Sequence, residues 1–167
     1  MAAYVNEVSH VDLPAGVEDE TRDLVGRLLG ATGGENVADI RLRLQDEMTD
    51  KASVFRTDES LRSVLGTIHS LRDRYQRASI QDKGEIFNYD LTEAIELGFL
   101  IDLAESLVLS ALARTESRGA HFRDDHPTRD DANWMRPSLA FRADDGSVRL
   151  DYKPVVGGKY EPMERKY

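Results

Sequence analysis

Apolar residues recur every three or four positions in four separate stretches of this chain, which is the spacing of one face of an α-helix. They predict helices over about 17–29, over about 36–51, from Thr57 through Tyr75, and over about 91–117. The last stretch is apolar on nearly every side, a pattern that is typical of a buried helix. We therefore expect 91–117 to be the central helix, with the two helices before it packed against it.

Polar residues at the ends of these stretches indicate where the helices begin and end. The side chains of Asn36 and Thr57 can accept a hydrogen bond from the first helical turn, so we predict that both are N-caps. Gly119 is predicted to be the left-handed residue that closes the last helix, because glycine adopts that conformation without a steric penalty. Ser117 would then lie inside the helical end.

The pattern changes beyond Ser138, where apolar and polar residues alternate as they do in a half-buried strand. Two such runs flank the segment 144–147, which reads Asp-Asp-Gly-Ser, and together they predict a β-hairpin. A hairpin is only marginally stable in water, so it must rest on the helices or on another domain. The tail from Lys153 to Tyr167 contains prolines and glycines and is expected to be extended.

The predicted fold is mainly all-α: a three-helix antiparallel bundle with a leading helix, a charged loop, and a C-terminal β-hairpin with an extended tail. We interpret residues 1–16 as a linker and the end of a preceding domain's helix. Residues 17–118 form the helical bundle. Residues 119–167 form the loop, hairpin and tail, packed on the bundle or on another domain.

Composition narrows the possible partners. The formal net charge of -9 disfavours nucleic acid and anionic membranes. The sequence has no cysteine, no apolar run of membrane-spanning length, and neither of the glycine-rich motifs that bind dinucleotides or nucleoside triphosphates. We therefore expect no nucleic-acid partner, no direct membrane insertion and no nucleotide site in this chain.

The most highly charged stretch runs from Arg114 to Trp134. It contains arginine but no lysine, and a planar guanidinium suits bidentate pairing with carboxylates in a fixed geometry. From residue types alone, the stretch fits either a solvated surface loop with a helix cap or a network that holds a shape or docks on a partner.

Three chemical roles are weaker interpretations of the same stretch. His121, Asp124, Asp125 and His126 offer metal ligands, but their spacing matches no standard set and the nearby arginines repel a cation. General acid–base catalysis by either histidine lacks an obvious nucleophile nearby. An arginine dock for a carboxylate or phosphate stays open, although the acidic residues compete for the guanidiniums. We assign no catalytic, cofactor-binding or metal-binding residue.

The charged stretch also carries a specific motif. It reads ESRGAH at 116–121, followed by Arg123, Asp124-Asp125, Pro127, Arg129-Asp130-Asp131 and Asn133-Trp134. This motif resembles the end of the flavoprotein subunit of succinate dehydrogenase and fumarate reductase. Less specific similarities occur at 40–48, 53–56, 87–88, in the hairpin and at 162–167. Members of that family often have a histidine shortly after this tryptophan, where the present chain has Arg136-Pro137.

The resemblance implies that a FAD-binding domain and a capping domain precede this helical domain in the same chain. The FAD, its covalent histidine and the substrate-binding residues would lie in those upstream parts. The full-length protein would oxidise succinate to fumarate and pass a hydride to FAD. Electrons would then reach an iron–sulfur subunit, in a complex with membrane-anchor subunits. The location implied is cytoplasmic, peripheral on the inner face of the membrane.

By the same resemblance, this fragment would bind no cofactor, would be inactive alone and would buttress the FAD domain. The residues expected to contact that domain, or to support its site from behind, are Glu116, Arg118, His121, Arg123, Asp125, Arg129 and Trp134. Two alternatives stay open. One is the same domain from L-aspartate oxidase or a relative, whose ESRGxH motif is similar. The other is a stand-alone helical interaction module.

Overall fold

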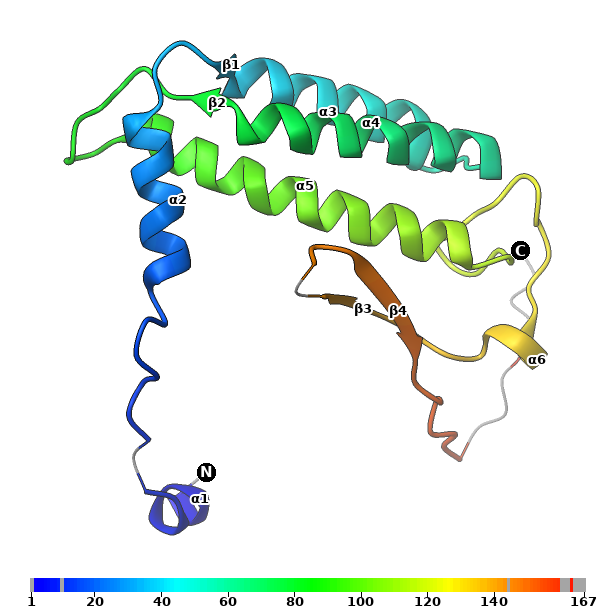
Figure 1. Cartoon of the computed structure of the whole chain (residues 1–167). Coiled ribbons are helices and arrows are strands. Elements are labelled where there is room, and N and C mark those ends of the chain that lie inside the picture. Colours follow the sequence, from blue (N-terminus) through cyan, green and yellow to red (C-terminus); the bar gives the residue numbers. More distant parts are fainter. Residues whose placement is uncertain (1, 10, 144, 160–162, 164–167) are drawn as a thin grey trace.

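The computed structural model describes residues 2–9, 11–143, 145–159 and 163. Its centre is a bundle of three antiparallel helices, which lie side by side in Figure 1: α3 (Val37–Ala52), α4 (Asp58–Gln76) and α5 (Tyr89–Ala113). The leading helix α2 (Asp19–Gly30) crosses the start of α5, and the short helix α1 (Ala2–Glu7) lies away from the bundle. The predicted mainly helical fold is confirmed.

Local hydrogen bonds explain where the bundle helices begin. The side chain of Asn36 accepts from the amide of Ala38 at 2.7 Å, and that of Asn88 accepts from the amide of Leu91 at 2.8 Å. Thr57 and Ser60 each bond the other's backbone amide, at 3.1 and 3.0 Å, which forms a capping box. The N-caps predicted at Asn36 and Thr57 are confirmed.

The core consists of the side chains that the helical spacing places on the inward faces. Residues of α3, α4 and α5 meet with essentially no exposed surface: Ile40, Leu61, Val64, Ile68, Leu97, Ile101 and Val108. A smaller cluster of Leu28, Ile80 and Ala94 attaches α2 to the start of α5. Burial of one such aliphatic side chain contributes about 1.5–3 kcal/mol, so these contacts define how the helices pack.

The end predicted for α5 is wrong. The helix stops at Ala113, and Arg114 is already extended with ψ at 103°. Gly119 does have a positive φ of 59°, but it lies in a turn where Arg118 and His121 exchange backbone hydrogen bonds at 2.7 and 3.0 Å. Ser117 is outside the helix as well, because its backbone and hydroxyl groups bond to the loop instead of to a helical turn.

The prediction that α5 is buried on nearly every side is also wrong. Phe99, Leu103 and Leu107 are 59%, 66% and 45% exposed. The helices α3 and α4 cover one face, while α2 and the hairpin touch another. We call these three residues the α5 strip. An all-apolar helix needs neighbours on every side, and the described residues leave this strip largely uncovered.

The C-terminal hairpin is present as predicted. Strand β3 (Ser138–Arg142) pairs antiparallel with β4 (Val148–Tyr152), with Ser138 opposite Tyr152 and Arg142 opposite Val148. The hairpin lies on the α5 side of the bundle in Figure 1, where Arg142 forms an ion pair with Asp102. Residues 153–158 continue without regular structure. The family-like end at 162–167 lies outside the described residues, except for Met163.

Two further strands are only two residues long. Strand β1 (Glu35–Asn36) pairs in parallel with β2 (Ala78–Ser79), which ties the segment before α3 to the segment after α4. Such short strands leave no alternating pattern, so the sequence does not predict them.

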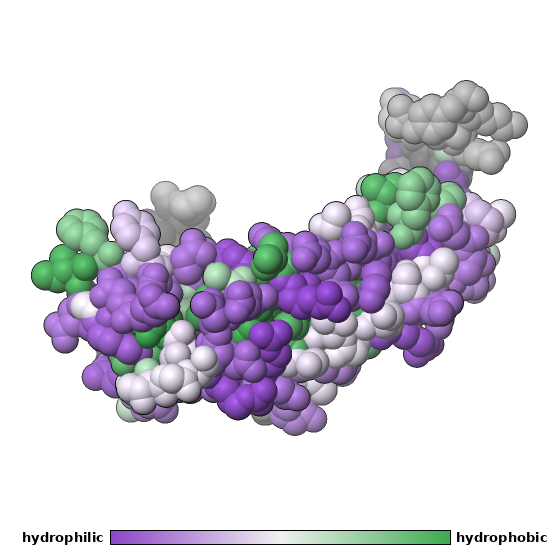
Figure 2. Space-filling model, turned by 90° about the horizontal axis from the view of Figure 1, so that it is seen from above, coloured by the Kyte–Doolittle hydropathy of each residue, from purple (hydrophilic) through white to green (hydrophobic). Residues whose placement is uncertain are grey.

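Seen from above, the surface is mainly hydrophilic, and its hydrophobic areas are small and separate (Figure 2). This face is therefore typical of a surface in contact with water. None of the helices in the described part of the chain combines the length and the hydropathy that a membrane span requires.

Candidate functional site

The charged loop joins α5 to the hairpin and contains a single helical turn, α6 (Asp131–Trp134). Glu116 is the centre of its first cluster. This side chain is fully buried and accepts from Arg114, from Arg118 and from the amide of Asp130, over 2.6–3.0 Å. Burial raises the pKa of Glu116, but these donors outweigh it and hold the pKa below its usual value. The carboxylate is therefore ionised and bonded inside the protein.

Asp131 extends this cluster toward the surface. It accepts from Arg118 at 2.6 Å and from Arg129 at 2.5 and 2.8 Å. The hydrogen bonds from Arg129 and Arg118 lower the pKa of Asp131 to about 2. Arg129 also donates to the carbonyl of Met163 at 3.1 Å, so the tail touches the loop here.

Arg123 fastens the loop to two helix ends. Its buried guanidinium donates to both carboxylate oxygens of Asp125 at 2.7 Å. It also donates to the carbonyls of Ala111 and Leu112, in the last turn of α5, at 3.0 and 3.2 Å. Asp125 in turn accepts from the amide of Asp58, the first residue of α4, at 2.8 Å. The hydrogen bonds from Arg123 hold the pKa of Asp125 far below its usual value. We call Arg123 and Asp125 the helix clamp.

His121 links the same region to the turn before α4. Its Nδ1 lies 3.1 Å from a guanidinium nitrogen of Arg56, and its Nε2 lies 3.3 Å from the carbonyl of Arg114. Since arginine only donates, Nδ1 accepts and Nε2 carries the proton that bonds the carbonyl. Burial, together with the charges of Arg56, Arg114 and Arg123, lowers the pKa of His121. The ring is therefore neutral at pH 7.

Trp134 connects the loop to the hairpin. It is nearly buried, its Nε1 donates to the hydroxyl of Thr115 at 3.2 Å, and its ring meets that of Tyr152 edge-on at 5.6 Å. The guanidiniums of Arg114 and Arg136 lie over the indole at 5.0 and 5.1 Å. A cavity of about 360 Å³ opens beside this stack. The residues lining it are Arg114, Arg118, His121, Trp134, Met135, Arg136, Pro137 and Val155.

The structure thus brings five of the seven candidate residues into two clusters, while His121 and Trp134 lie outside them and contact Arg56 and Thr115. Glu116, Arg118, Arg129 and Asp131 form one, and Arg123, Asp125 and the cap of α4 form the other. Sequence reasoning missed Arg56 and Asp58, because the partners of both lie more than 60 positions away. The described residues contain no group of three or more His, Asp or Glu side chains placed to hold a metal ion. This arrangement stabilises a loop and does not place a nucleophile beside a base.

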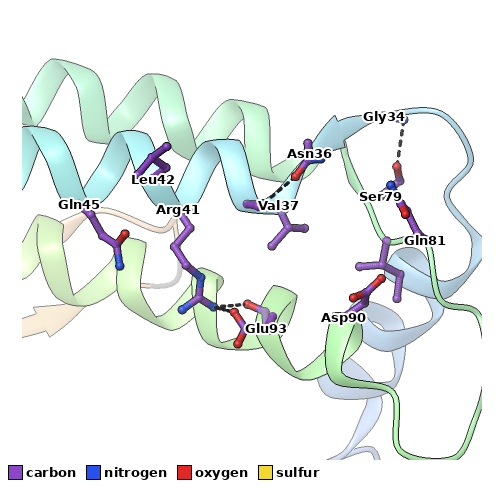
Figure 3. Close-up of a pocket in the computed structure, with 12 residues that line it drawn as sticks. Gly34, Asn36, Val37, Arg41, Leu42, Gln45, Ser79, Gln81, Asp90 and Glu93 are labelled. Carbon is purple, nitrogen blue, oxygen red and sulfur yellow. Dashed lines mark hydrogen bonds and ion pairs between the residues drawn. The ribbon is translucent and has the colours of Figure 1, made fainter.

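A larger cavity, of about 430 Å³, lies at the opposite end of the bundle, between α3 and α5. Figure 3 shows Arg41 pointing from α3 toward Glu93 on α5, whose carboxylate and carbonyl it contacts at 2.8 Å. Glu96 lies 3.8 Å away. Because Arg41 is already neutralised, this cavity presents no unpaired cation among the described residues that line it.

Comparisons with known proteins agree with this geometry. The family model described as fumarate reductase flavoprotein C-term matches residues 41–167. The chain is 48% identical over 126 residues to the succinate dehydrogenase flavoprotein subunit of Rickettsia felis, which covers 75% of this chain and 21% of that protein. It is 39% identical over 164 residues to the fumarate reductase flavoprotein subunit of Escherichia coli, covering 97% of this chain and 27% of that protein.

Solved structures show the same relationship. A quinol fumarate reductase of E. coli superposes with a TM-score of 0.87 and 33% identity, over 98% of this chain and 29% of that one. Adenylylsulfate reductase of Archaeoglobus fulgidus shares the fold, with a TM-score of 0.78 at 18% identity. The fold and loop are those of a flavoprotein C-terminal domain. The chain belongs to the succinate dehydrogenase and fumarate reductase flavoprotein family, as the loop motif predicted, and it spans between a fifth and a third of the length of these relatives.

Proposed function

We propose that this chain is the C-terminal part of a longer flavoprotein that interconverts succinate and fumarate, and that it buttresses the part that holds FAD. The observation that carries the proposal is the uncovered α5 strip. Phe99, Leu103 and Leu107 form an apolar surface on the longest helix, and apolar area of this kind is typical of a contact with another domain. Support also comes from the relatives, most of whose length lies outside the region matched here.

The chemistry would belong to the remainder of the protein. A dinucleotide cofactor is usually held by a parallel sheet with a glycine-rich turn before a helix. Parallel pairing in the described residues is limited to the two-residue strands β1 and β2, so these residues do not fit a FAD site. FAD would supply hydride acceptance from succinate when bound elsewhere in the protein, and the loop residues of this chain would act by positioning.

The charged loop and the tail would form the rim of the contact with the FAD domain. Glu116, Arg118, Arg123, Asp125 and Arg129 would support it through the two clusters described above, and His121 and Trp134 through their contacts with Arg56 and Thr115. Because those clusters are bonded internally, they would present a preformed surface that loses little conformational entropy on docking. The wider assembly would include an iron–sulfur subunit and membrane-anchor subunits, with this chain peripheral on the cytoplasmic face.

The test compares the full-length flavoprotein with a version that ends before residue 17 of this chain. We expect the full-length protein to retain FAD and to oxidise succinate with an artificial electron acceptor, whereas the truncated version loses FAD or aggregates. The 167-residue chain alone should show no flavin absorbance and no activity. A truncated protein with undiminished FAD content and activity would refute the proposal that this chain supports the FAD domain. Flavin binding by the isolated chain would show that the cofactor site lies here.

A further inference from the structure

Arg136 differs from the other arginines of the loop. Arg114, Arg118 and Arg123 each bond a carboxylate at 2.6–3.0 Å. The guanidinium of Arg136, in contrast, lies 4.1 Å from the ring centre of Tyr152 and 5.1 Å from that of Trp134. Within the described part of the chain, no carboxylate or carbonyl accepts a hydrogen bond from it. Stacking occupies the faces of the guanidinium and leaves the in-plane N–H groups free to donate.

These contacts hold Arg136 in place before any partner arrives. An exposed arginine normally loses much rotamer freedom when it forms an ion pair, and this loss offsets most of the attraction. Two aromatic contacts restrict that freedom in advance. The planar fork is therefore presented in a fixed orientation, which is the geometry that bidentate pairing with a carboxylate requires.

The cavity beside Arg136 favours the same ligand. Arg114 and Arg118 also line it, and these two cations share the buried carboxylate of Glu116, while Arg118 also pairs with Asp131, which does not line the cavity. The cavity is therefore locally positive, on a chain whose net charge is -9. Apolar side chains such as Val155 and Pro137 form the rest of the wall, so no carboxylate among the described lining residues competes for the guanidinium of Arg136.

We propose that this cavity receives one carboxylate side chain, Asp or Glu, from the part of the flavoprotein outside this chain, and that Arg136 pairs with it. The inference rests on the proposed function, since it requires such a remainder. A side chain of the same protein fits better than a free anion, because Arg136 is the one lining arginine without a carboxylate partner among the described residues. The guanidinium of Arg136 can pair with one carboxylate, and docking of the rest of the protein would hold that carboxylate close at a high effective concentration.

The first experiment measures thermal unfolding of the full-length flavoprotein and of the isolated 167-residue chain, each with Arg136→Gln. If Arg136 only stacks on the hairpin, the midpoint falls no further in the full-length protein than in the isolated chain, because the same loss of free energy shifts the midpoint of a larger protein less. We expect a fall at least about 2–4 °C larger in the full-length protein, and the excess should shrink at high salt. The matched control is Arg149→Gln, which removes an arginine that stacks on Phe141 at 4.7 Å but already has Asp151 at 3.5 Å. It should show no such excess.

The second experiment identifies the partner. The full-length Arg136→Lys variant is treated with a carbodiimide, which joins an amine to an adjacent carboxylate as an amide with loss of water. We expect a cross-linked peptide that pairs residue 136 with an Asp or Glu outside residues 1–167 and is absent from the wild type. Cross-links confined to this chain overturn the inference, and so does a midpoint shift in the full-length protein that is no larger than in the isolated chain. So does stabilisation of the isolated wild-type chain, but not of Arg136→Gln, by inorganic phosphate, since the site would then take a free anion. The truncation experiment judges the proposed function independently of these outcomes.

Discussion

Replacing Arg123 with alanine tests the claim that the helix clamp holds two helix ends together. The substitution removes both hydrogen bonds to Asp125 and those to the carbonyls of Ala111 and Leu112. It leaves Asp125 with the amide of Asp58 as a donor, and it opens a space in a site where the Arg123 side chain is 1% exposed.

The expected magnitude follows from these contacts. Removing one partner of a buried ion pair typically lowers stability by about 3–5 kcal/mol, because the remaining charge loses its compensation. Asp125 is partly exposed, so water would recover some of that loss, whereas the two carbonyls lose their donor and add to it. We expect Arg123→Ala to lower the free energy of unfolding by about 4 kcal/mol. For a chain of this size this corresponds to a fall of roughly 8–16 °C in the unfolding midpoint.

The assay is urea unfolding of the 167-residue chain, followed by far-ultraviolet circular dichroism. The control is Arg62→Ala, which removes an exposed ion pair to Asp58 and should change stability far less, because solvent screens that pair. If Arg123→Ala lowers the free energy of unfolding no more than Arg62→Ala does, the helix clamp does not stabilise the fold and the reasoning from burial is refuted.

Three further predictions concern other parts of the chain. Tyr75→Phe should raise stability by about 1 kcal/mol in urea unfolding, because the buried hydroxyl of Tyr75 has no hydrogen-bond partner among the described residues; a loss of stability would show that the hydroxyl is bonded. Thr57→Ala should lower stability by about 1 kcal/mol through loss of the capping box with Ser60, and Thr57→Ser should restore most of it. The pKa of Asp131 is about 2 in the folded chain against 3.8 ordinarily, so its contribution is complete above the ordinary value and disappears as the pH falls toward about 2. Acid titration of Asp131→Asn, followed by circular dichroism, should therefore show a weaker loss of stability over that range than the wild type, and identical curves would contradict the assignment.

The sequence predicted the features that depend on neighbours along the chain. Asn36 and Thr57 cap helices through residues two or three positions away, so local pattern is sufficient to place them. The alternation in 138–152 similarly specifies a hairpin, whose strands are joined by a short turn. Both kinds of feature are decided by short-range geometry.

The features that the sequence did not predict depend on distant residues. At the end of α5, Arg123 donates hydrogen bonds to the carbonyls of Ala111 and Leu112. These bonds hold the loop against the last helical turn, and the sequence pattern does not reveal them. Exposure of Phe99 and Leu103 depends on which neighbours are present, and hydropathy alone does not specify them. The loop motif identified the family and the charged residues, but it could not assign their partners, since Arg56 and Asp58 lie just before and at the start of α4, far away along the chain.

The helix clamp also has a consequence for the order of folding. It joins Asp125 to Asp58, 67 positions apart, and its geometry exists only once the end of α5 and the start of α4 lie side by side. A contact that closes so long a segment and needs both helices to be formed should arise after the rate-limiting step. Arg123→Ala should then accelerate unfolding while leaving the folding rate nearly unchanged. The helix clamp would thus form late in folding. It would slow unfolding, and so lengthen the lifetime of the native state, while having little influence on the folding rate.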